Sequence, residues 1–130
     1  MEKEIKMTET DSVLNATKVT LGLNIEDDSF DRDLLSYING AIGVVDQAGG
    51  LKEPTMITDA STTWDSICLP NATVKVFVQM YVITYTRIHF DPPAPSTQKI
   101  MESSMTETIW RLEIAVDAYR KEVESEYGIL

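Results

Sequence analysis

The chain has 130 residues, of which 43% are hydrophobic and 25% charged, a size and balance typical of one compact domain with a single core. Asp and Glu number 21 against 11 Lys and Arg, which gives a formal net charge of -10. Negative charge repels phosphate, so tight binding to the backbone of DNA or RNA is disfavoured. The apolar runs are shorter than the roughly 20 residues of a spanning helix, and no membrane span is expected.

The first ten residues alternate charge and threonine without an apolar period. They predict a flexible leader over residues 1–10, followed by a single helical domain over residues 11–130. The leader lacks the apolar core of a secretory signal, and the single cysteine, Cys68, cannot close an intramolecular disulfide. Both features favour a reducing compartment.

A first short helix is predicted between Asp11 or Ser12, whose oxygens suit an N-cap, and Gly22. Its apolar face comprises Val13, Leu14, Thr17 and Leu21.

A second helix is predicted over Phe30–Ala48, capped by Asp27-Asp28-Ser29 and ended by Gly49-Gly50. Gly40 and Gly43 weaken it, so we expect another helix to approach there. Its residues at helical spacing are Phe30, Leu34, Ile38, Ala41 and Val45.

The segment Leu51–Asn71 has no helical period and contains Pro54, Pro70 and a serine-threonine cluster. A loop of this length in a small domain is usually functional or docked. We expect Thr55–Asn71 to contact a partner through Trp64, because large aromatic side chains in loops often supply binding energy. The alternative is that Trp64 folds back onto the core of its own chain.

A third helix is predicted over Ala72–Phe90, although its β-branched content would also suit a strand. It is apolar on two faces, which places it at the centre of the fold or at a subunit contact. The sequence Asp91-Pro92-Pro93-Ala94-Pro95 ends it, because proline excludes helical angles at the preceding residue.

A fourth helix is predicted from Ser96 or Thr97 to Val123, packed along the second and third. One long stripe predicts burial along its whole length. Trp110 and Ile114 project from the opposite side and need a partner of their own. The stripe consists of Met101, Met105, Ile109, Leu112, Val116, Tyr119 and Val123.

No residue pattern supports catalysis, a cofactor or a metal. Counting a calcium loop from Asp27 puts Arg32 at the glycine position and Ile38 at the position of the bidentate glutamate. His89 is the single histidine, and with Cys68 it would supply at most half of a zinc site. The glycines match no phosphate-binding loop. We therefore predict that the protein is not an enzyme.

Three segments, taken in order, resemble the head-tail connector (head-completion adaptor) proteins of tailed bacteriophages. The first is Val19-Thr20-Leu21-Gly22-Leu23 with the helix beginning Asp31-Arg32-Asp33-Leu34-Leu35. The second runs from Ile57-Thr58-Asp59 through Ser61-Thr62-Thr63-Trp64-Asp65. The third and most specific is Phe90-Asp91-Pro92-Pro93 followed by Ile109-Trp110-Arg111-Leu112.

The predicted elements together give an all-α fold: a small four-helix domain with a long docking loop between its second and third helices and a long C-terminal helix. The resemblance implies a small helical subunit of a ring, twelvefold in the virion, that lies below the portal protein, extends the DNA channel without binding DNA tightly, and meets other head-completion or tail proteins. Before assembly such a subunit is in the host cytoplasm. The candidate partner-binding residues are Trp64, Asp65, Asp91, Pro92, Pro93, Trp110, Arg111 and Ile114.

Two other readings stay open at this point. A free-standing helical interaction or regulatory module would have the same helices without a ring. A metal-dependent hydrolase would need bound metal.

Overall fold

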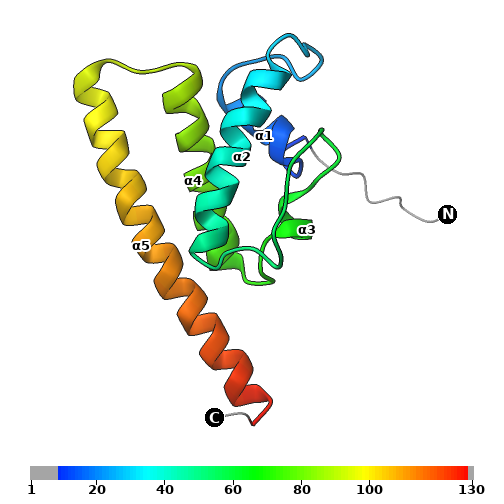
Figure 1. Cartoon of the computed structure of the whole chain (residues 1–130), viewed down its shortest axis with the longest axis vertical. Coiled ribbons are helices and arrows are strands. Elements are labelled where there is room, and N and C mark those ends of the chain that lie inside the picture. Colours follow the sequence, from blue (N-terminus) through cyan, green and yellow to red (C-terminus); the bar gives the residue numbers. More distant parts are fainter. Residues whose placement is uncertain (1–8, 129–130) are drawn as a thin grey trace, which may run out of the picture.

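The computed structural model describes residues 9–128, and this part of the chain is all-helical, as predicted. In Figure 1 the helices are α1 (Val13–Thr20), α2 (Asp31–Gln47), α3 (Trp64–Ile67), α4 (Ala72–Phe90) and α5 (Pro95–Glu126). Most of the predicted leader lies outside the described residues. Within residues 9–128, no helix is both long and apolar enough to cross a membrane.

Helix α4 is the centre of the domain, with α2 packed on one side of it and α5 on the other (Figure 1). The prediction that the last helix packs along two others is therefore only half right, because α5 runs along α4. It approaches the end of α2 at the Gly49-Gly50 turn. A Cβ atom on Gly50 would come within 2.9 Å of Val78 Cγ2 and 3.4 Å of Leu112, so only glycine fits this junction without a shift.

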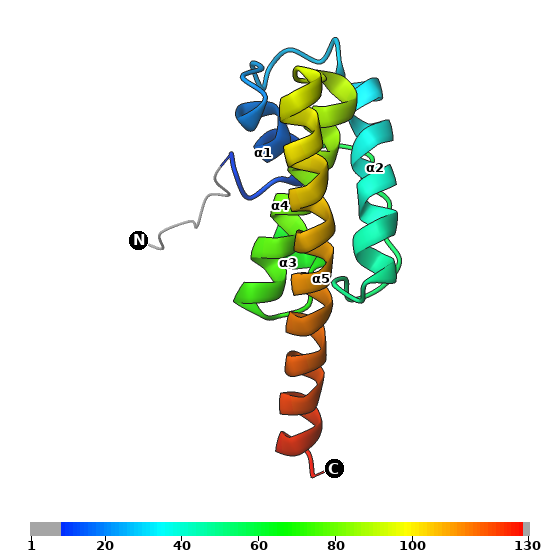
Figure 2. The same cartoon turned by 90° about the vertical axis from the view of Figure 1, so that its left-hand side faces the viewer.

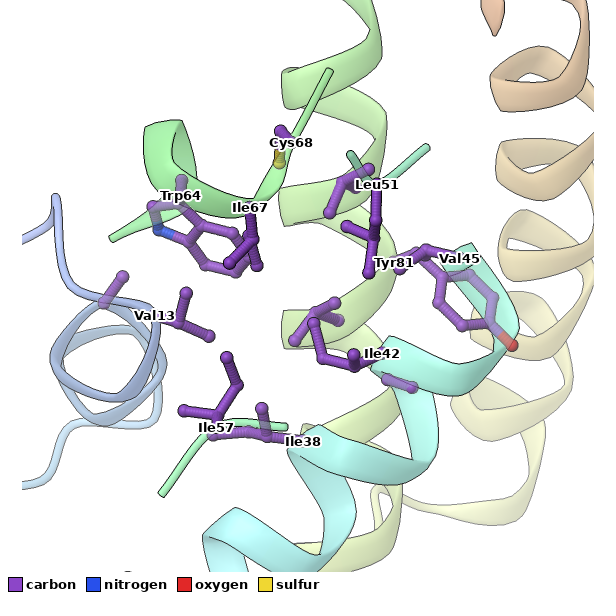
Figure 3. Packing of buried hydrophobic residues seen from close by; sticks show 14 of the residues in the cluster. Val13, Ile38, Ile42, Val45, Leu51, Ile57, Trp64, Ile67, Cys68 and Tyr81 are labelled. Carbon is purple, nitrogen blue, oxygen red and sulfur yellow. The ribbon is translucent and has the colours of Figure 1, made fainter. Parts of the chain in front are cut away.

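The core joins side chains from all five helices and from the segment between α2 and α3. Figure 3 shows part of it, with labelled residues from α1 to α4 and from that segment. The predicted stripes of α1 and α2 are buried, apart from Leu21, which is half-buried, and Phe30, which is 40% exposed and packs edge-to-face on Phe90. Gly40 does face another helix, since a Cβ there would meet Tyr85 of α4, whereas nothing approaches Gly43. The residues with no exposed surface include Val13, Leu34, Ile38, Ala41, Val45, Val74, Val78, Val82 and Leu112.

Side-chain caps begin α1, α3 and α4. Ser12 Oγ accepts a hydrogen bond from the Asn15 N–H at 3.2 Å, as predicted, and Asn71 does the same for Val74 at 3.0 Å. The predicted cap of α2 is wrong. Asp27 accepts from the Ser29 N–H in the preceding turn, and Phe30 occupies the cap position without a side-chain bond.

The predicted count of four helices omitted α3. Four residues are too few to show a helical period, and the segment reads as loop on both sides. Its beginning is nevertheless capped, since Thr63 Oγ1 accepts from the Ser66 N–H at 3.2 Å. The long connection between the second and third predicted helices therefore contains one helical turn.

Helix α5 is less buried than its stripe predicted. Of the predicted stripe, only Leu112 and Val116 are in the core, and the other five residues, Met101, Met105, Ile109, Tyr119 and Val123, are half-buried. For Tyr119 and Val123 the reason is length, because the C-terminal part of α5 extends past the other helices (Figures 1 and 2).

Candidate assembly surface

Exposed apolar side chains of α5 lie where this helix meets α4. Trp110 and Ile114 are 58% and 50% exposed, and they line one hollow with Phe77 of α4. Val76 and Met80 of α4 are also exposed, at 48% and 46%, but they do not line that hollow. The prediction that the Trp110 side of the helix lies outside the core is thus confirmed within this subunit. These residues would be costly to leave in water, which is typical of a surface with a partner.

A hollow of about 330 Å³ lies on this surface, and we call it the α4–α5 groove. The hollow exists because Ala115 and Ala118 on α5 have side chains that end at Cβ. Phe77 of α4 is partly buried beside it. The groove combines an apolar floor with one cationic side chain. It is lined by Thr73, Phe77, Trp110, Arg111, Ile114, Ala115 and Ala118.

Arg111 supplies that positive charge. Its Nη2 lies 2.9 Å from Glu107 Oε1, and its Cζ lies 5.9 Å from the centre of the Trp110 ring. Both members of the Arg111–Glu107 pair are more than half exposed, and an exposed pair one helical turn apart contributes little to stability. Arg111 is therefore able to exchange Glu107 for a carboxylate on another molecule.

The segment between α2 and α3 is docked on its own chain. The Asn39 side chain accepts from the Ile57 N–H at 2.7 Å and donates to the Ile57 carbonyl at 2.9 Å. At the far end, the Val13 N–H donates to the Thr62 carbonyl and the Trp64 N–H to the Asp11 carbonyl. These bonds fix the segment to α2 and α1.

The expected role of Trp64 as an exposed anchor is wrong. Its side chain is 2% exposed and lies beside Val13 and Ile67 in the core (Figure 3). Helix α3 turns the indole inward, so Trp64 supports the loop from beneath.

Asp65, the next residue, is exposed at the surface. Its carboxylate lies 2.7 Å from Lys75 Nζ, and this hydrogen bond raises the pKa of the lysine. The pair links α3 to the first turn of α4.

The Asp91-Pro92-Pro93 turn lies between α4 and α5, at the opposite end of α4 from the groove. Asp91 and Pro92 are exposed, and the Asp91 N–H donates to the Arg87 carbonyl at 2.8 Å. The eight candidate residues are therefore not one site. Trp110, Arg111 and Ile114 share the groove, while Asp65 and the proline turn lie elsewhere.

Helical spacing also left several surface residues unassigned. Val76 and Met80 were expected on the second apolar face of α4, but the sequence did not predict what that face would contact. Met56, which is 72% exposed, has no periodic neighbours that could mark it.

Two further titratable side chains, His89 and Cys68, lie outside the groove. His89 stacks on Tyr85 with ring centres 4.2 Å apart, and its Nδ1 lies 2.8 Å from the Tyr85 carbonyl oxygen, to which it donates. Burial raises the pKa of the Cys68 thiol to about 11, so the thiol stays protonated at neutral pH. Among residues 9–128, no three His, Cys, Asp or Glu side chains are grouped as metal ligands would be.

Comparison with known proteins gives one match. A family model described as "Phage connector protein" matches residues 13–119, which is most of the chain. No curated protein and no solved structure matches.

Proposed function

Because the chain belongs to the phage connector protein family, whose members are structural proteins of the virion, we propose that it forms a ring beneath the portal protein of a tailed phage. The ring, twelvefold by resemblance to the family, extends the DNA channel and receives the next head-completion or tail protein. Subunits are made in the host cytoplasm and join the head as it is completed.

The observation that carries this proposal is the α4–α5 groove with Trp110 and Ile114. Both side chains lie outside the core of their own subunit, and tryptophan and arginine are the residues that most often dominate binding energy at protein interfaces. Asp65 and the Asp91-Pro92-Pro93 turn are further proposed contacts, because they too are exposed.

The charge of the chain also supports a channel wall. A net charge of -10 gives carboxylates a large excess over cations, and carboxylates repel the phosphates of passing DNA. A wall that conducts DNA must not hold it.

The test is recruitment to the purified portal of the same phage, measured by co-sedimentation. Ile114→Asp places a charge in the groove, and we expect recruitment to be lost while the helical circular dichroism is kept. Ser103→Asp is the matched control, because it adds the same charge at an exposed position of α5 outside the groove. Normal recruitment of Ile114→Asp, or failure of the wild-type chain to bind the portal at all, would contradict the proposal.

A further inference from the structure

Met56 is fixed in an outward position. The next residue, Ile57, is 1% exposed, and Asn39 holds both its N–H and its carbonyl. Met56 directly precedes this buried, hydrogen-bonded residue, and its own side chain faces solvent. With 72% of its surface exposed, Met56 is an apolar knob on a backbone that is already fixed, so binding has to order only its side chain.

Carboxylates lie on both sides of the knob. Glu53 and Asp59 are exposed three residues before and three residues after Met56. Asp59 accepts hydrogen bonds from the side chain and the backbone N–H of Ser61, which lower the pKa of its carboxyl. The segment therefore presents an apolar side chain between two negative charges at neutral pH.

The α4–α5 groove has the complementary character. Its lining is apolar around Phe77 and Ile114, and its cation is Arg111, which would have to leave Glu107 to meet a carboxylate of another copy. A methionine side chain has four heavy atoms, roughly 120 Å³ at about 30 Å³ for each water-sized group. The hollow of about 330 Å³ is large enough for it, and an unbranched thioether adapts well to an irregular pocket.

We propose that Met56 of one copy of this chain enters the α4–α5 groove of the next copy, with the Glu53 and Asp59 carboxylates facing Arg111. This inference rests on the proposed ring and names the contact between its subunits. The knob and the groove are different surfaces: Figure 1 shows the segment between α2 and α3 on the side of α2 away from α5. A contact between two different surfaces is head-to-tail, and such contacts form a ring when the rotation between neighbouring copies closes.

Cysteine cross-linking tests this contact directly. Met56→Cys and Ile114→Cys are made separately in a Cys68→Ala background, mixed, and oxidised with and without the portal. We expect the mixture to give disulfide-linked dimers and each variant alone to stay monomeric. The variant carrying both cysteines should give a ladder of oligomers. Ser103→Cys replaces Ile114→Cys in the matched control, which should give about tenfold less dimer.

A charge reversal provides the second test. Arg111→Glu should lower the yield of the 56–114 cross-link about tenfold, and adding Glu53→Lys and Asp59→Lys should restore it. The proposal is overturned if Ile114→Cys alone forms dimers, if the mixture gives no more dimer than the Ser103→Cys control, or if the charge reversal has no effect. Rings on the portal without this cross-link would remove the contact and leave the proposed function standing. A chain that neither binds the portal nor cross-links would remove both.

Discussion

Asn39 is the residue that most directly orders the Met56 segment. Replacing it by alanine leaves the N–H and the carbonyl of Ile57 without their partners, and Ile57 is buried. An unsatisfied buried polar group costs about 1–3 kcal/mol, so Asn39→Ala should lower the free energy of unfolding by that amount in urea titrations. Asn24→Ala, at an exposed turn, is the control and should cost less than about 0.5 kcal/mol. Equal losses of unfolding free energy for the two variants would mean that the hydrogen bonds between Asn39 and Ile57 do not stabilise the fold.

Cys68 makes stability depend on alkaline pH. Burial raises the pKa of its thiol from 9.0 to about 11, so above pH 9 the unfolded chain loses the proton while the folded chain keeps it. The contribution of this thiol to the free energy of unfolding is fully present below pH 9. It falls by about 1.4 kcal/mol per pH unit as the pH rises toward 11. From pH 8 to pH 10, the unfolding free energy of the wild-type chain should fall by about 1.4 kcal/mol more than that of Cys68→Ala. Parallel curves for the two proteins would contradict this assignment.

The two tryptophans mark what residue type can and cannot predict. Trp110 lies in a strongly periodic helix, so helical spacing alone predicted that it lies on the face opposite the Leu112 stripe. Trp64 lies in a segment without helical or strand periodicity. Neither its residue type nor its sequence neighbours could distinguish an exposed anchor from a core residue. The role of Asn39 could not be predicted from the sequence either, because its hydrogen-bond partner, Ile57, is 18 residues away along the chain.

At the scale of elements, the long helices could be predicted because the apolar period and the stop signals agreed, although the predicted cap of α2 was wrong. Helix α4 spans Ala72–Phe90, the range that the sequence indicated, even though its β-branched residues favoured a strand. Two features depended on tertiary context instead. Helix α3 is a single turn, and the exposure of the end of α5 depends on where its neighbours stop.

Leu112 tests whether α5 is part of the core. It has no exposed surface and lies opposite the groove side of α5. Leu112→Ala should lower the free energy of unfolding by about 2–5 kcal/mol, through lost burial and the cavity left behind. Ile114→Ala, two residues along the same helix and half exposed, should cost less than about 1 kcal/mol. A loss below about 0.5 kcal/mol for Leu112→Ala would remove α5 from the core.

For the whole molecule, charge predicts behaviour toward DNA. With a net charge of -10, the subunit should show no appreciable affinity for duplex DNA at physiological salt. Fluorescence anisotropy with a labelled duplex measures this, with a basic protein of similar size as the positive control. Micromolar binding that weakens steeply with salt would reveal a basic face and would contradict the idea of a repelling channel wall.

The central claim is that this chain is a ring subunit below the portal. Electron microscopy of the protein mixed with the purified portal of its phage tests it most directly. The account predicts portal particles with an added ring of density at the end of the channel, sharing the rotational symmetry of the portal. Portal particles unchanged by an excess of the protein would contradict it.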